Sequence, residues 1–115
     1  MLITTNVRAF ICREPVDMRK SIDGLSYLVE PMLKQNPASG NLFVFVARDR
    51  SKVKCLYWDR TGFALWYKRL EHGRFPSTAL LAERGFTLAE LNAWLEGIEI
   101  PACKPQHTVC VARVS

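Results

Sequence analysis

Features of membrane and exported proteins are missing from this sequence. No run of apolar residues approaches the ~18 in succession that a membrane span needs. Residues 1–8 lack the basic-then-apolar order of a secretory signal. We therefore expect a cytoplasmic protein with no membrane partner. The composition, 49% apolar and 23% charged over 115 residues, is typical of one folded domain with a single core and not of a disordered chain.

Metal-binding patterns are missing as well. The four cysteines form no Cys-x-x-Cys pair, and neither His72 nor His107 completes a zinc pattern. Cys12 and Cys55 lie in apolar runs, where a thiol packs like a small hydrophobic side chain. We expect reduced, structural thiols, no metal ion and no cofactor.

The sequence also lacks the common catalytic motifs. It has no Gly-rich phosphate loop, no Gly-x-Ser-x-Gly nucleophile turn and no His-Glu-x-x-His helix. A nuclease or transposase site with two metals needs several carboxylates that converge on ions about 3.5–4 Å apart. The acids of this chain fall at a predicted helix cap, on a helix face and in turns. We therefore expect no catalytic residues and no enzyme activity.

Positive charge, by contrast, is concentrated in one segment. Residues 48–74 hold eight cations and three acids, so their net charge is +5, the same as that of the whole chain. Clustered positive charge raises the rate of association with nucleic acid or an acidic partner. Two further cations lie at the start of the first predicted helix. The candidate phosphate contacts are Lys52, Lys54, Lys68, Arg69, Arg74, Arg48, Arg50, Arg19 and Lys20.

Four aromatic rings are interleaved with these cations. Tyr57 and Trp58 precede an Asp59–Gly62 turn, and Trp66 and Tyr67 follow it, which predicts a β-hairpin. Trp58 and Trp66 are candidates to stack on unpaired bases. The alternative is that the rings belong to the core and that the cations form an ordinary solvated face.

The apolar pattern predicts a strand over residues 6–12 and then a helix. Asp17 is predicted as the N-cap of this helix, because its carboxylate can accept from amides in the first turn. From Met18 the apolar residues recur in steps of four and three, which places one stripe on the sheet. The stripe comprises Met18, Ile22, Leu25, Val29 and Met32.

Three strands over residues 42–47, 52–58 and 63–70 follow, and their short turns predict an antiparallel meander. The first is apolar on both faces, as in a central strand. Strand alternation places Lys52 and Lys54 on one face, and an in-register hairpin would add Lys68 and send Arg69 to the other.

A second helix is predicted from Thr87, where Thr87 and Glu90 have the spacing of a capping box. Its stripe comprises Leu88, Leu91, Trp94 or Leu95, and Ile98. The order strand, helix, meander, helix predicts a single α+β domain over residues 1–100, with one sheet covered by one or two helices. Residues 101–115 are predicted to be a loosely ordered tail.

Several of these motifs together resemble a known family, the TnpB (second open reading frame) accessory proteins of the IS-sixty-six family of bacterial insertion sequences. The resemblance covers residues 7–76. It is carried by Asp17-Met-Arg-Lys20, Asp23-Gly-Leu25, Ser39-Gly-x-Leu42-Phe-Val-Phe45, Lys54-x-Leu-Tyr-Trp-Asp59, Gly62-Phe63 and Tyr67-Lys-Arg-Leu-Glu-x-Gly-Arg-Phe75. It implies a small accessory protein for transposition, with the strand-transfer chemistry in a separate, larger transposase.

Two functions fit these observations. The first is a non-catalytic accessory protein that binds nucleic acid, DNA or RNA, through the basic, aromatic-rich meander. The second is a protein-interaction adaptor that binds the transposase or another element-encoded protein without contacting DNA. Salt separates the two, because phosphate contacts weaken linearly in log affinity against log salt and an apolar interface responds little.

Overall fold

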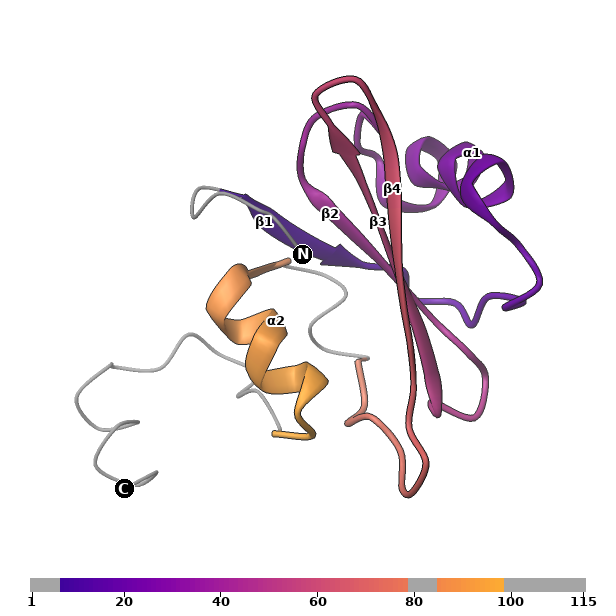
Figure 1. Ribbon diagram of the computed structural model, residues 1–115, viewed down its shortest axis with the longest axis vertical. Helices are drawn as coiled ribbons and strands as arrows, with labels where there is room; N and C mark the ends of the chain where they lie inside the picture. The colour runs from indigo at the N-terminus through magenta and orange to yellow at the C-terminus, as the bar shows by residue number, and fades with distance from the viewer. Residues whose placement is uncertain (1–6, 79–84, 99–115) are drawn as a thin grey trace.

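A single mixed sheet organises the chain, and a helix lies on each of its faces (Figure 1). The computed structural model describes residues 7–78 and 85–98 of the chain. The predicted α+β class with one sheet is confirmed. The elements are β1 (Arg8–Ile11), α1 (Ile22–Leu33), β2 (Leu42–Val46), β3 (Lys52–Asp59), β4 (Gly62–Arg69), β5 (Phe86–Thr87) and α2 (Leu88–Leu95).

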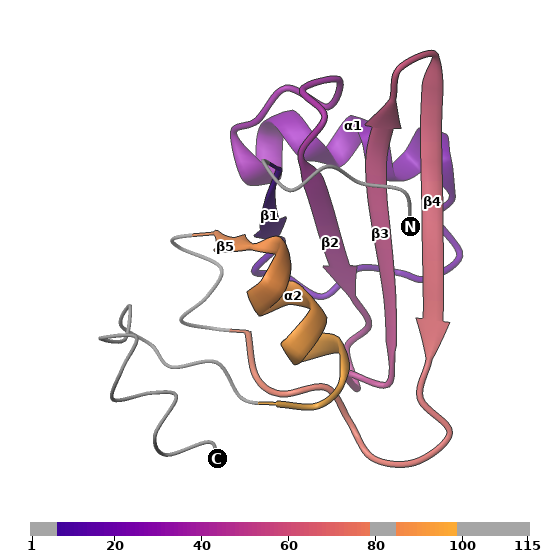
Figure 2. The ribbon, with the colours of Figure 1, turned by 60° about the vertical axis from the view of Figure 1, so that its left-hand side comes forward.

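The order of strands across the sheet is β4-β3-β2-β1-β5. The pairs β2–β3 and β3–β4 are antiparallel, which confirms the predicted meander. β1 pairs in parallel with β2, because α1 carries the chain back across the sheet between them. β5 then pairs antiparallel with β1, so that it lies beside the first strand although it comes late in the chain (Figure 2).

The face of the sheet under α1 has its own apolar core. Leu25 and Val29 of α1 are fully buried against Phe43, Phe45 and Leu56 of the strands. The predicted stripe is therefore confirmed at its centre, with Ile22 and Met18 half-buried on the same cluster. Its last member, Met32, is exposed, and the adjacent Leu33 packs on the cluster in its place.

The face under α2 has a second core. Leu91, Trp94 and Leu95 are buried there, and the Trp94 ring stacks on Phe75 with 4.8 Å between the ring centroids. The predicted capping box is confirmed, since the Glu90 amide donates to Thr87 Oγ1 and the Thr87 amide donates to Glu90 Oε1. The prediction that Ile98 continues the stripe is wrong.

Helix α1 begins later than predicted, and Asp17 is not its N-cap. The N-cap is Ser21, whose side chain makes no capping hydrogen bond. Asp17 instead accepts from the backbone amide of Arg19 at 2.9 Å and pairs with the Arg19 guanidinium. This local turn competes with the first helical turn, because an aspartate bonded two residues ahead favours a non-helical backbone.

Cys12 and Cys55 are both buried free thiols, as expected, and burial raises the pKa of Cys55 to about 12. No helix within residues 7–78 and 85–98 is both long and apolar enough to cross a membrane. The predicted tail, residues 101–115, lies outside the described residues.

Candidate nucleic-acid interface

Three loops meet at one end of the sheet. β1, β2 and β4 end there and β3 begins there, because β1 is parallel to β2 and the meander reverses direction twice. The Val16 amide donates to the Val46 carbonyl at 3.0 Å, and the Phe75 amide donates to the Arg50 carbonyl at 2.7 Å. These bonds join residues 12–21, 47–52 and 69–75 into one surface, here called the basic end.

The basic end gathers most of the predicted cations. It holds eight cations and four acids. The acids are Glu14, Asp17, Asp49 and Glu71. The cations are Arg13, Arg19, Lys20, Arg48, Arg50, Lys52, Arg69 and Arg74. Sequence reasoning missed Arg13, since it lies far along the chain from the cationic segment and reaches it only through the parallel pairing of β1 with β2.

Five of these cations are available to a ligand. Within the described part of the chain, the side chains of Lys20, Arg48, Arg50, Lys52 and Arg74 make no hydrogen bond or ion pair. Lys20, Arg48 and Arg74 are exposed, and the other two are half-buried. Unpaired guanidinium and ammonium groups at one surface are suited to phosphate.

Arg19 and Arg69 are paired instead. The Arg19 guanidinium lies 2.7 Å from Asp17 Oδ2, and hydrogen bonds from Arg19 lower the pKa of Asp17 to about 2. Arg69 lies 3.3 Å from the Glu71 carboxylate. Both pairs are exposed, and exposed pairs contribute little to stability. A phosphate could therefore replace either carboxylate as the partner of its arginine.

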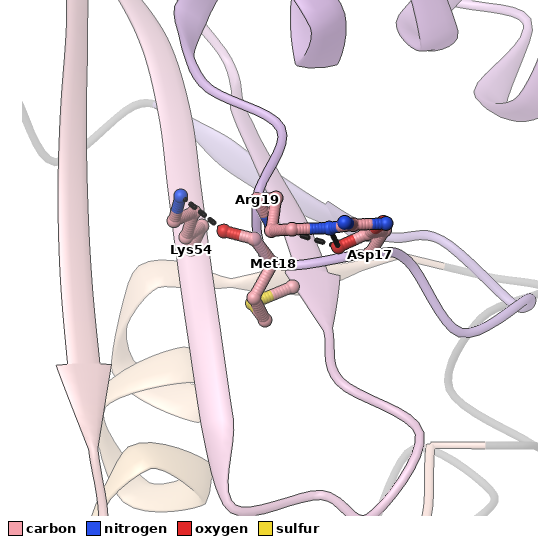
Figure 3. A network of polar contacts seen from close by, with 4 residues as sticks. All are labelled: Asp17, Met18, Arg19 and Lys54. Atoms are coloured by element: carbon pink, nitrogen blue, oxygen red, sulfur yellow. Dashed lines mark hydrogen bonds and ion pairs between the residues drawn. The ribbon is translucent and has the colours of Figure 1, made fainter.

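Lys54 is not a surface cation. Its side chain is buried, with 8% of the residue exposed, and its ammonium donates to the Met18 carbonyl at 2.7 Å (Figure 3). It also donates to the Lys20 carbonyl at 2.8 Å. The same ammonium lies 5.1 Å from the centroid of the Tyr67 ring. The structure therefore makes Lys54 a support for the loop before α1 and removes it from the phosphate contacts.

Lys68 is also removed from the predicted face. The hairpin pairs Val53 with Lys68 and Lys52 with Arg69, so Arg69 shares the face of Lys52 and Lys68 does not. The predicted placement was wrong because the two-residue turn pairs each odd-numbered residue with an even-numbered one. The Lys68 ammonium donates to the Leu95 carbonyl at 3.2 Å, at the C-terminal end of α2, where a cation is favoured.

Both predicted stacking rings are used in packing. Trp66 is half-buried against the core under α2. Trp58 makes an edge-on contact with Phe63, with 5.0 Å between the ring centroids. The exposed ring of β4 is Tyr67, at 50% exposure. Neighbouring residues of a strand point to opposite faces, and this alternation between Trp66 and Tyr67 was the sequence signal that could have identified the Tyr67 ring.

A groove of about 710 Å³ crosses the basic end on the α1 face. Its walls come from the loop before α1, the β2–β3 turn and β4. They are Pro15, Val16, Asp17, Met18, Arg19, Ala47, Arg48, Asp49, Lys52 and Tyr67. A second hollow of about 560 Å³ lies on the other side of the β2–β3 turn and is lined in part by Arg13, Arg48 and Arg50.

The β2–β3 turn that separates the two hollows is tightly held. The Arg50 amide donates to the Ala47 carbonyl at 2.9 Å, and Arg50 has a left-handed backbone with a φ of 61°. Asp49 accepts from the amide and the hydroxyl of Ser51, and these bonds lower the pKa of Asp49. The turn therefore holds Arg48 and Arg50 at fixed positions on the surface.

Among the described residues, no group of three or more His, Cys, Asp or Glu side chains is placed to hold a metal ion. Three acids of the basic end are hydrogen-bonded or ion-paired to a residue two positions away in the chain. They are Asp17, Asp49 and Glu71. The expectation that the chain has no catalytic activity stays a prediction.

All of the described residues lie within a stretch that is similar to known proteins. Residues 7–105 match the family described as IS66 Orf2-like protein. The uncharacterized protein y4hO of Sinorhizobium fredii is 41% identical over 99 residues, which cover 82% of this chain and 83% of that protein. The uncharacterized protein y4jC of the same organism is 39% identical over 69 residues, 60% of this chain and 59% of its own length. No solved structure is significantly similar.

Proposed function

The chain belongs to the IS66 Orf2-like family of insertion-sequence accessory proteins, and we propose that it assists transposition without catalysis, by binding nucleic acid at the basic end. The observation that carries this proposal is the convergence of unpaired cations from three separate loops. The loop before α1 brings Lys20, the β2–β3 turn brings Arg48 and the adjoining Lys52, and the loop after β4 brings Arg74. Such a surface follows a phosphate backbone and carries no sequence readout of its own.

Neutralising two of these cations tests the proposal. We expect Arg48→Gln with Lys52→Gln to weaken binding of a labelled DNA and to lower its salt slope by about 1.4–1.8, since each lost phosphate contact removes about 0.7–0.9. Fluorescence anisotropy over a range of salt concentrations measures both quantities.

The matched control removes the same charge at the opposite end of the sheet. Lys34→Gln with Arg60→Gln neutralises the C-cap of α1 and the β3–β4 turn, both distant from the basic end. This control should bind DNA with the wild-type salt slope. Equal losses in the two double variants, or an unchanged slope in the folded Arg48/Lys52 variant, would show that the basic end is not the site.

A second function, binding the element's transposase, is favoured by β4. This strand is eight residues long, lies at the edge of the sheet and contains no proline. Its residues 63–67 carry no charge. Proteins usually protect an edge strand with charge, proline or a covering segment, and a bare edge can add a strand from a partner.

The two functions respond to different variants. We expect transposase binding through the β4 edge to persist in high salt and in the Arg48/Lys52 variant, and to fall in Ala64→Glu, which places a charge on that edge. Pull-down of the element's transposase with the purified protein measures it. Capture that is lost at high salt and in the Arg48/Lys52 variant would assign the interaction to the basic end instead.

A further inference from the structure

The groove on the α1 face contains one exposed aromatic ring among its cations. We propose that it binds a nucleotide of a single strand, with the base stacked on Tyr67 and the phosphates on Arg48 and Lys52. This inference rests on the proposed function and names its ligand as unpaired rather than duplex nucleic acid. It replaces the rings that sequence reasoning selected, Trp58 and Trp66, by one that the fold leaves accessible.

The Tyr67 ring is held in place before any ligand arrives. It projects from β4 on the α1 face, opposite Lys54 of β3. The Lys54 ammonium, 5.1 Å from the ring centroid, is itself fixed by the carbonyls of Met18 and Lys20. Half of the Tyr67 surface remains exposed. A ring that already contacts a fixed cation and is still exposed to solvent loses little conformational entropy when a base stacks on it.

The other walls of the groove divide into apolar and cationic parts. Val16 and Met18 offer an apolar surface beside the ring, which suits the flat face of a base. Arg48 and Lys52 line the groove from the β2–β3 turn and the start of β3, and neither side chain makes a hydrogen bond or ion pair within the described residues. A stacking ring beside unpaired cations is the arrangement by which proteins bind single strands.

Two carboxylates also line the groove, and each has a local partner. Asp17 is paired with Arg19, and Asp49 accepts from the Ser51 amide at 3.0 Å. Both repel phosphate and attract the amino groups of bases. They therefore favour the orientation in which the amino groups of the base face the two carboxylates and the phosphates lie against the cationic wall formed by Arg48 and Lys52. A duplex cannot adopt this orientation, because its bases are already stacked on one another.

The test compares a labelled single-stranded DNA of about 20 nucleotides, longer than the about 4–16 nucleotides that one single-strand-binding domain covers, with the same strand in a duplex. Wild-type protein should bind the single strand more tightly. Tyr67→Leu should weaken single-strand binding by about 5- to 150-fold, the range for one lost stacking contact. It should leave duplex binding unchanged, and Tyr67→Phe should retain wild-type affinity for both.

A matched control and an RNA strand complete the experiment. Tyr27→Leu changes another tyrosine, 78% exposed on α1 and outside the groove, and should have no effect. An RNA strand of the same sequence that loses affinity in Tyr67→Leu also supports an unpaired nucleotide, and its affinity relative to DNA identifies the preferred sugar.

The failures of the two proposals are distinct. Binding to neither single strand nor duplex would overturn the proposed function and this inference together. Equal binding to single strand and duplex, with no effect of Tyr67→Leu and a loss in the Arg48/Lys52 variant, would keep the basic end and overturn the stacking site. A circular dichroism spectrum of Tyr67→Leu that matches the wild type excludes misfolding as the cause of any loss.

Discussion

At the scale of single residues, Lys54 is the one buried cation within residues 7–78 and 85–98. Its buried ammonium satisfies two backbone carbonyls in the loop before α1, groups that would otherwise be costly to bury. The same ammonium supports the Tyr67 ring that lines the groove. Lys54 thus shapes the groove beside which the candidate ligand-binding cations of the basic end lie.

Replacing Lys54 with Met should therefore reduce stability. We expect the free energy of unfolding to fall by about 1.5–3 kcal/mol, the usual value of hydrogen bonds to a charged group. Lys52→Met is the matched control, two residues away on the same face and without a hydrogen bond, and should stay within about 0.5 kcal/mol of the wild type. Urea titrations of both variants measure the difference, and equal effects would contradict the role assigned to Lys54.

The Asp17–Arg19 pair predicts a dependence on pH. Hydrogen bonds from Arg19 lower the pKa of Asp17 from 3.8 to about 2. Because the pKa is lowered in the folded state, the pair stabilises the fold above pH 3.8 and loses its effect as the pH falls through about 2. An NMR titration of the Asp17 carboxyl measures the pKa. In Arg19→Gln it should rise toward 3.8, and a pKa that stays near 2 would show that Arg19 is not the cause.

At the scale of elements, α1 depends on its buried face. Leu25→Ala should reduce the free energy of unfolding by about 2–5 kcal/mol, because it leaves a cavity between α1 and the sheet. Tyr27→Ala changes the exposed face of the same helix and should have little effect. Denaturant titration of the two variants separates them. Similar losses would mean that Leu25 does not pack as described.

The elements show what could be read from the sequence and why. The central strand β2, the meander, the centre of the α1 stripe and the capping box at Thr87 follow from local patterns, and each is confirmed. The start of α1 could not be read in this way, since Asp17 accepts from the amide of Arg19 in a local turn and the actual N-cap, Ser21, makes no side-chain capping hydrogen bond. β5 is two residues long and has no strand pattern of its own.

The candidate site was predicted in part for the same reason. Charge clustering identified Arg48, Lys52 and Arg74, which the structure brings together at the basic end. The face occupied by Lys68 depended on whether the hairpin pairs Lys52 with Lys68 or with Arg69. The burial of Lys54 depended on the loop before α1, which comes from another part of the chain. Composition could not supply either one.

For the molecule as a whole, Cys55 reports on global stability. It lies in β3, completely buried in the core under α2, and burial raises its pKa to about 12. Alkylation at pH 8 therefore requires the sheet to open. We expect the alkylation rate of Cys55, measured by peptide mass spectrometry, to rise more than tenfold in Leu25→Ala, in step with the lost stability. A fast rate in the wild type, or no change in the variant, would mean that Cys55 is reached by local opening.

The place of β1 in the sheet has a consequence for synthesis. β1 is made first, yet one of its two edges is paired only when Phe86 and Thr87 have been added. At about 5–20 residues per second, a nascent chain waits about 4–15 s between the two events. During that interval Ala9 and Ile11 also lack the cover of α2. The open edge of β1 is then a place where the emerging chain can pair with another nascent chain, and we expect slower translation of residues 12–85 to lower the yield of folded protein.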